Sequence, residues 1–212
     1  DKVESAVEAL VADGAQPATQ DRLARDVDAV ITMLRTGEVV TEVLTGDAGL
    51  FAQAAKNTLF IDSSTIDVNA ARTLSGQAVA AGMTMVDAPV SGGVPGAEAA
   101  TLTFMVGGEE ADVIRARPIL EVMGRSIVHA GPAGAGQAAK ICNNMILGIS
   151  IIAVAEAFRL ADKLGLKAET LYEIVSRSSG DCWVLNNNPP VPGLIPTSSA
   201  NDNYRPGFSS AL

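Results

Sequence analysis

The sequence predicts an α/β fold in which a mostly parallel, doubly wound sheet is joined by one long helix to an all-α C-terminal region. Short apolar runs of strand length alternate with segments of helical periodicity as far as residue 130. This alternation is typical of βα units with helices on both faces of the sheet. No proline interrupts residues 136–166, which are rich in alanine, isoleucine and leucine. That segment predicts a single long helix.

The elements are expected in a regular order along the chain. Residues 1–13 have helical periodicity, and Gly14 is expected to end that helix. Strands are predicted at residues 27–34, 58–62, 83–87, 102–106 and 126–130. Helices are predicted at residues 39–51, 68–81 and 111–123, and again at 168–176 after the long helix. We place the domain boundary between residues 1–135 and 136–212.

The segment from residue 178 to residue 208 contains several prolines and asparagines and has no periodic pattern. We expect it to be an ordered irregular excursion rather than a linker, because Trp183, Tyr204 and Phe208 need burial.

Composition limits the class of protein. The 212 residues are 48% hydrophobic and 18% charged, which allows a substantial globular core. Acidic residues outnumber basic ones by 24 to 15, so we expect no nucleic-acid partner. Cys142 and Cys182 have neither metal nor disulfide spacing, and no signal-peptide pattern is present, which favours a reducing, cytoplasm-like compartment without a metal site. The apolar run at residues 145–155 is about half of the ~20 residues that span a bilayer, so we expect a buried helix and no membrane.

Ligands of parallel α/β sheets bind beyond the carboxyl ends of the strands. The loops after Leu34, Asp62 and Asp87 are therefore the candidate sites. Ser91, Gly92 and Gly93 offer consecutive backbone N–H groups that could hold a carboxylate or phosphate, although a simple strand-ending turn explains the same residues. The run Ser63-Ser64-Thr65 could contact a cofactor or could cap the helix that follows.

The long helix places polar groups near its start. Lys140 and Asn144 lie four residues apart on one face, and Asn143 is turned by about 100°. An ammonium group on an apolar face needs a partner or a task, although a lysine that extends into water fits the same position. His129 is expected to be structural and Cys142 to be a small core residue. Trp183 is expected in the core or a pocket wall.

Several motifs, at separated positions and in the same order, are similar to those of the 3-hydroxyisobutyrate dehydrogenases, within the β-hydroxyacid dehydrogenase family. They are DAPVSGG (87–93), LTFMVGG (102–108), GQAAKICNN (136–144), ITML (31–34), IDSSTID (61–67), SSGDCW (178–183) and NPPVPG (188–193). The resemblance covers essentially the whole chain. It implies a Rossmann-like dinucleotide-binding domain, a helical domain and a homo-oligomer that forms through the helical domain.

The resemblance also implies NAD-dependent oxidation of 3-hydroxyisobutyrate to methylmalonate semialdehyde in valine catabolism. Lys140 would take the hydroxyl proton, and Asn144 would bind the hydroxyl group or orient Lys140. The substrate carboxylate would bind the loop made by Ser91, Gly92 and Gly93, with help from Asn143.

The cofactor side follows from the same resemblance. Leu34, Arg35 and Thr65 would line the nicotinamide and its ribose. Asp1 resembles the acidic residue that reads the ribose hydroxyls, which favours NAD over NADP. Three alternative functions remain open for the chain. It could belong to another β-hydroxyacid dehydrogenase, to a tartronate semialdehyde reductase, or to a non-catalytic member of the family that serves oligomerisation or interaction.

The chain departs from the family at several points. Arg35 stands in place of a proline, Val39 in place of an asparagine, and Ala100 in place of a glycine that would suit a positive φ angle. A GxGxxG loop and a KDL-containing segment, which the family has before and after these motifs, are absent. We therefore expect an internal piece of a larger dehydrogenase, inactive by itself, from a bacterial cytoplasm or a mitochondrial matrix.

Overall fold

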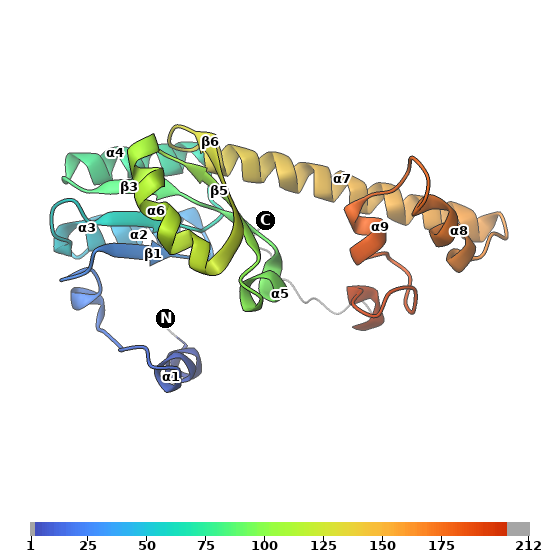
Figure 1. Ribbon diagram of the computed structural model, residues 1–212, viewed down its shortest axis with the longest axis horizontal. Helices are drawn as coiled ribbons and strands as arrows, with labels where there is room; N and C mark the ends of the chain where they lie inside the picture. The colour runs from blue at the N-terminus through green and yellow to red at the C-terminus, as the bar shows by residue number, and fades with distance from the viewer. Residues whose placement is uncertain (1–2, 203–212) are drawn as a thin grey trace. The chain divides into compact units, whose positions relative to one another are not determined.

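The computed structural model describes residues 3–202 and has two compact units, Asp1–Lys140 and Ile141–Leu212 (Figure 1). The boundary between the units falls within the longest helix, α7 (Ala135–Lys163).

The first unit is built on a six-stranded sheet whose strands are ordered β1-β2-β3-β5-β4, with β6 paired to β5. The strands are β1 (Ala29–Thr32), β2 (Leu59–Asp62), β3 (Thr84–Asp87), β4 (Val90–Ser91), β5 (Leu102–Gly107) and β6 (Gly124–Gly131). The first three are parallel and in register, and β6 is parallel to β5. Only the pairings of β5 with β3 and β4 are antiparallel. The predicted mostly parallel α/β sheet is confirmed.

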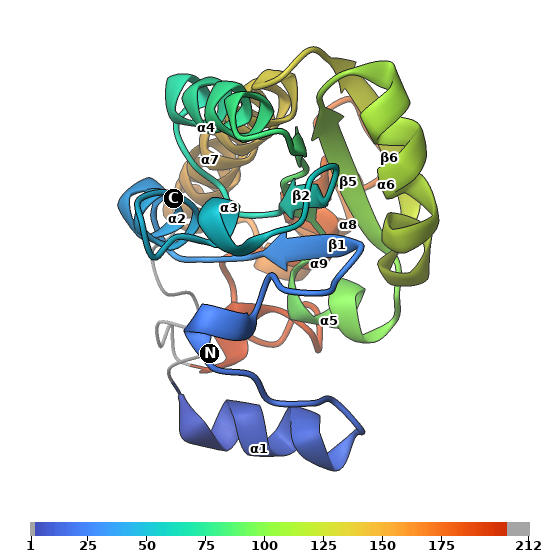
Figure 2. The ribbon, with the colours of Figure 1, turned by 90° about the vertical axis from the view of Figure 1, so that its left-hand side faces the viewer.

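Helices cover both faces of this sheet (Figure 2). One apolar cluster joins Phe60 and Met85 of the strands to the helices α2 (Gly37–Leu44), α3 (Leu50–Gln53) and α4 (Val68–Ala80). The other cluster joins Ile61 and Val86 to α6 (Glu110–Met123). Neighbouring residues of a strand point to opposite faces, so β2 and β3 each supply apolar side chains to both cores. The helix α1 (Glu4–Ala12) contributes no buried residue.

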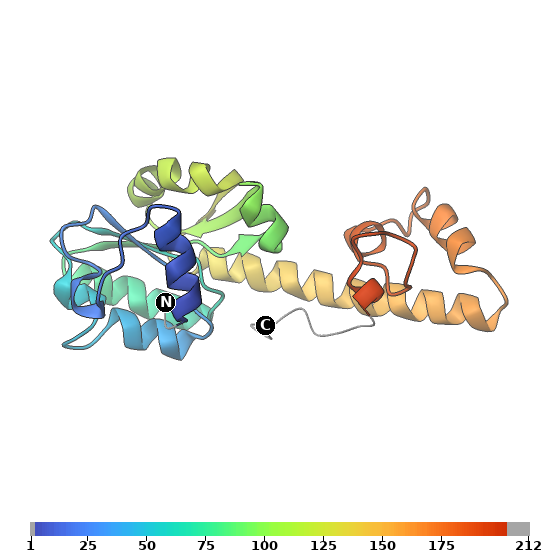
Figure 3. The same cartoon turned by 90° about the horizontal axis from the view of Figure 1, so that it is seen from below.

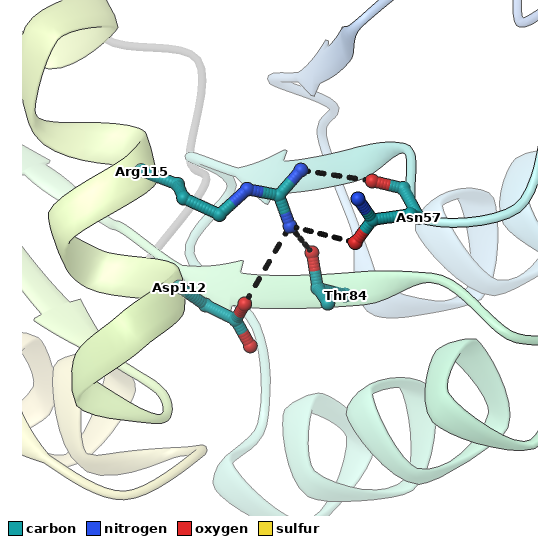
Figure 4. A network of polar contacts seen from close by, with 4 residues as sticks. All are labelled: Asn57, Thr84, Asp112 and Arg115. Carbon is teal, nitrogen blue, oxygen red and sulfur yellow. Dashed lines mark hydrogen bonds and ion pairs between the residues drawn. The ribbon is translucent and has the colours of Figure 1, made fainter.

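An arginine on α6 holds this helix to the amino ends of β2 and β3 (Figure 4). Arg115 donates to the Thr84 hydroxyl at 2.9 Å, to the Asn57 side chain at 3.2 Å and to the Asn57 carbonyl at 2.8 Å. Asp112, one turn earlier, lies 3.8 Å from the same guanidinium. These contacts stabilise the amino edge of the sheet and leave the carboxyl edge to the loops.

Two local predictions were wrong. The helix predicted at residues 39–51 is split into α2 and α3, because the chain turns at Gly46, which has a φ of 81°. The neighbouring Gly49 packs so closely on the Thr45 carbonyl that a Cβ atom would overlap it. The segment after β3, expected as a plain loop, contains the two-residue strand β4 and the helix α5 (Gly93–Glu98). Elements this short leave no periodic signal in the sequence.

The second unit holds most of α7 together with α8 (Ala168–Val175), α9 (Trp183–Asn187) and the 3₁₀ turn η2 (Ser199–Asp202) (Figure 3). Its small core contains Val154 and Phe158 of α7 and Val184 and Leu185 of α9. Asn188 orders the irregular segment, because its side-chain oxygen accepts hydrogen bonds from the Ser199 N–H and hydroxyl, both at 2.9 Å.

The expectation that α7 is a buried helix was wrong for this chain. Apolar side chains spaced three or four residues apart are exposed along one face, at Ile141, Met145, Ile149 and Ile152. Among the described residues, α7 is the one helix with the length and hydropathy of a membrane span. Cys142, expected in the core, is exposed.

Trp183, predicted to be buried, is 62% exposed, while its neighbours Val184 and Leu185 are buried. Tyr204 and Phe208 lie outside the described residues.

Candidate functional site

The loops that follow β1 and β2 are tied together at the carboxyl edge of the sheet. The Ser64 hydroxyl donates to Asp62 Oδ1 at 2.6 Å and accepts from the Leu34 N–H at 2.9 Å. Thr32 donates to the same Asp62 oxygen at 2.8 Å. The interpretation of Ser63, Ser64 or Thr65 as the cap of α4 was wrong. Asp67 caps this helix, because its side chain accepts hydrogen bonds from two backbone N–H groups.

Asp62 is a buried carboxyl group with unusual electrostatics. Burial raises the pKa of Asp62, hydrogen bonds from Ser64 and Thr32 oppose that rise, and the nearby Asp87 charge adds to it. Its Oδ2 atom has no hydrogen-bond partner among the described residues.

Asp87, at the end of β3, holds the start of α7. Its Oδ1 accepts from the Gly134 N–H at 2.7 Å, and its Oδ2 accepts from the Gln137 N–H at 2.9 Å. A carboxylate at a helix N-terminus satisfies free N–H groups and interacts favourably with the helix dipole. Gly107 and Gly136 allow this close approach, because a Cβ atom at Gly107 would lie 2.5 Å from Asp87 Oδ1.

Lys140 follows one turn after this capped start. Its side chain is half-buried, and burial lowers the pKa of the ammonium group. The Lys140 ammonium makes no hydrogen bond or ion pair with any residue that the structure describes. A partly desolvated, unpaired lysine fits a chemical task better than it fits a solvated surface position.

The two asparagines lie further along α7, in the second unit. Asn143 Nδ2 donates to Asn144 Oδ1 at 3.3 Å. In a continuous helix, Asn144 lies one turn after Lys140 on the same face.

The loop at Ser91, Gly92 and Gly93 has the backbone of an anion cradle. Ser91 is half-buried and pairs with Thr103 across β4 and β5. Gly92 and Gly93 have φ angles of 135° and 62°, which side-chain-bearing residues rarely adopt. Their N–H groups donate no hydrogen bond within the described part of the chain, so both are available to a ligand.

The other residues singled out from the sequence differ in their exposure and their contacts. Leu34 and Thr65 are half-buried in the loops after β1 and β2, whereas Arg35 is exposed. Asp1 lies outside the described residues. The expectation of a structural His129 fits its Nε2 atom, which lies 2.9 Å from the Gly108 carbonyl and 3.0 Å from that of Gly131. No cluster of three or more His, Cys, Asp or Glu side chains suited to a metal occurs among the described residues.

The loops after β1 and β2 combine an apolar side chain with hydroxyl groups. Leu34 offers an apolar contact and Thr65 a hydroxyl group, both accessible at the edge where parallel α/β sheets bind ligands. In the loop after β2, the buried Ser63 hydroxyl has no partner among the described residues. A flat ring that carries a polar amide suits this combination.

Sequence reasoning missed the buried polar residues that organise the edge, namely Asp62, Asp87 and Gln137. A signal was present for two of them. Asp62 and Asp87 end adjacent strands with similar sequences, TLFID and MTMVD, and they pair in register.

Comparison with known proteins supports an NAD-binding chain. Residues 1–131 match the family model described as the NAD-binding domain of 6-phosphogluconate dehydrogenase. Residues 134–212 match the model described as NAD-binding of NADP-dependent 3-hydroxyisobutyrate dehydrogenase.

Named relatives and a solved structure agree with these matches. A Mycobacterium tuberculosis protein named "Probable 3-hydroxyisobutyrate dehydrogenase" is 56% identical over 88% of this chain and 63% of its own length. A Pseudomonas aeruginosa NAD-dependent L-serine dehydrogenase is 46% identical over 100% of this chain and 72% of its own length. The structure of the M. tuberculosis 3-hydroxyisobutyrate dehydrogenase with L-serine has a TM-score of 0.89 at 51% identity, over 99% of this chain and 71% of that one.

The chain thus spans slightly less than two thirds of the length of the mycobacterial relative. The two family models cover nearly every residue in the expected order. The chain belongs to the 3-hydroxyisobutyrate dehydrogenase family, within the NAD-binding β-hydroxyacid dehydrogenases.

Proposed function

We propose that the full-length protein oxidises 3-hydroxyisobutyrate to methylmalonate semialdehyde with NAD, as a step of valine catabolism. The observation that carries this proposal is the half-buried Lys140, unpaired among the described residues and with a lowered pKa, one turn after the capped start of α7. A lysine whose pKa is lowered by burial is neutral, and able to accept a proton, at a lower pH than an ordinary lysine.

The reaction needs a hydride acceptor, a base and a carboxylate clamp. NAD supplies the hydride acceptor when it is bound. Lys140, in its neutral form, accepts the proton of the substrate hydroxyl, and Asn144 on the same helical face binds that hydroxyl group. The N–H groups of Gly92 and Gly93, with the Ser91 hydroxyl, bind the carboxylate, and Asn143 assists. Leu34 and Thr65, with the neighbouring Arg35, hold the nicotinamide side.

L-Serine is the second candidate substrate, because one relative is named for its oxidation and a similar structure contains it. Both molecules are 3-hydroxy acids, so the same base and clamp serve either one. They differ at C2, where one has a methyl group and the other an ammonium group. Comparison of kcat/KM for the two acids, and for tartronate semialdehyde in the reducing direction, assigns the substrate.

Replacement of the proposed base tests the function directly. In the full-length protein, we expect Lys140→Ala to lower kcat by about 10²- to 10⁴-fold, the usual contribution of a positioned acid–base group, without loss of NAD binding. Lys163→Ala, on an exposed turn of the same helix, is the matched control.

The pH dependence provides a second readout. Because only neutral Lys140 accepts a proton and burial lowers the pKa of Lys140, wild-type kcat/KM should rise with pH and level off below the ordinary lysine pKa. This rise should be missing from Lys140→Ala. Full activity of Lys140→Ala would show that Lys140 is not the base. A wild-type protein that binds NAD but turns over none of these substrates would indicate a non-catalytic member of the family.

We also propose that a second copy of the protein covers the exposed apolar face of α7, and that the protein acts in a bacterial cytoplasm. Support for the first comes from Ile141, Met145, Ile149 and Ile152, all exposed on the second unit. Support for the second comes from the similarity to bacterial relatives, although a Drosophila melanogaster relative at 48% identity is named mitochondrial.

A further inference from the structure

Gln137 is fully buried in the first turn of α7 and joins this helix to the loop after β2. Its Nε2 donates to the Ser64 carbonyl at 2.8 Å, and its Oε1 accepts from the Ile66 N–H at 3.1 Å. The two backbone groups stand on either side of Thr65. One side-chain amide therefore brackets the residue proposed to face the cofactor.

Gln137 is itself held by its backbone, because its N–H donates to Asp87 Oδ2 at 2.9 Å. On the other side, Ser64 is connected to Asp62 and to the Leu34 N–H through its hydroxyl group. These buried hydrogen bonds connect the ends of three neighbouring strands to the base of α7, all inside the first unit.

We call the two hydrogen bonds of the Gln137 side chain, to the Ser64 carbonyl and from the Ile66 N–H, the bracket. Lys140 lies three residues after Gln137 on the same helix, so nearly one turn separates the bracket from the proposed base. The Gln137 amide therefore directly links the loop at Thr65 to the turn of α7 that precedes Lys140. A displacement of about 1 Å at a reacting group can cost about a hundredfold in rate, even when the substitution is remote from the chemistry.

We propose that Gln137 is a positioning residue that sets the nicotinamide loop at Thr65 against the turn of α7 that carries Lys140. This inference rests on the proposed function. Gln137 touches neither substrate nor cofactor in this assignment, and it acts through the backbone on both sides of Thr65.

The test compares two substitutions in the full-length protein. Gln137→Met keeps the size of the side chain but removes both hydrogen bonds. Gln137→Glu accepts from the Ile66 N–H at any pH but can donate to the Ser64 carbonyl only when it is protonated. The control is Arg115→Met, which removes the buttress at the amino edge of the same sheet, away from the loops.

We expect Gln137→Met to lower kcat of the folded enzyme by about tenfold or more at every pH, with a larger kinetic isotope effect for substrate deuterated at the carbinol carbon. The ratio of Gln137→Glu to wild-type kcat should fall as pH rises, because the deprotonated side chain faces the Ser64 carbonyl. Arg115→Met should lower the denaturation midpoint without a change in kcat. A purely structural role predicts that all three variants lose stability and keep kcat, and that result would overturn the proposal.

Hydrogen exchange separates this inference from the proposed function. Amide exchange across residues 63–67 should be faster in Gln137→Met than in wild type and unchanged in Arg115→Met. If wild type oxidises no 3-hydroxy acid, the proposed function fails, while faster exchange still supports the bracket. Unchanged exchange at these residues overturns the bracket whatever the activity.

Discussion

At the scale of single residues, Ala100 adopts a conformation that suits glycine. Its φ angle is 53°, just after the end of α5. The Thr101 N–H donates to the Gly96 carbonyl at 2.8 Å, and the Ala100 N–H donates to that of Ala97 at 3.1 Å. This pair of bonds is the Schellman pattern, in which the left-handed position is usually glycine.

We predict that Ala100→Gly raises the free energy of unfolding by about 1 kcal/mol, because the methyl group strains a left-handed backbone. Ala99→Gly is the matched control. Ala99 has a φ of −86°, so the added backbone freedom should destabilise that variant by about 0.5–1 kcal/mol. Denaturant unfolding of both variants measures the difference, and a destabilised Ala100→Gly would contradict the argument.

Single residues also mark the limit of sequence reasoning at the site. Lys140 could be identified from its place in a helix and a motif, and the strain at Ala100 from a missing glycine. Gln137 could not be identified, because its partners lie 71 and 73 residues away in the chain. Only the folded sheet edge brings these atoms together.

At the scale of elements, the loop between β4 and α5 allows the carboxylate cradle to be tested. A Cβ atom at Gly92 would lie 3.0 Å from Leu102 Cδ2, whereas one at Gly93 would meet nothing closer than Pro95 at 3.7 Å. We expect Gly92→Ala both to lower stability and to raise KM for the acid.

Gly93→Ala should raise KM with a smaller loss of stability, since strain of about 1 kcal/mol in a left-handed conformation is its main cost. The NAD dissociation constant should stay near the wild-type value in both variants. An unchanged KM for the acid in both would return this loop to the role of a strand-ending turn.

Helices and strands could be predicted from the sequence where the element was long enough to show a periodic pattern of apolar residues. The strands β1, β2, β3 and β5, and the helices α4, α6 and α7, were recognised from apolar periodicity. The break between α2 and α3 depends on the positive φ angle of Gly46 and on the close backbone contact of Gly49. The elements β4 and α5 are too short to show a period. The sequence predicted that α7 is buried, whereas its apolar face is exposed in this chain. Apolar side chains indicate that a helix face needs a partner, but they do not identify that partner.

At the scale of the whole molecule, we predict that Ile149→Glu shifts the full-length protein toward smaller assemblies. Ile149 is 60% exposed at the centre of the apolar face of α7, and burial of a charge in an apolar interface is costly. Val122→Glu is the control, on an exposed position of α6. Sedimentation velocity should show dissociation only for Ile149→Glu, and a wild-type monomer would refute the proposed second copy.

The fixed start of α7 also limits how the chain can change in length. Asp87 and the close packing of Gly107 on Gly136 leave the helix no room to slide at its amino end. One residue inserted between Gly136 and Lys140 would rotate the lysine by about 100° and advance it by about 1.5 Å. No loop lies between these two positions to absorb the change. Deletions and insertions in this interval should therefore be as damaging as loss of the lysine itself, although every side chain of the site would still be present.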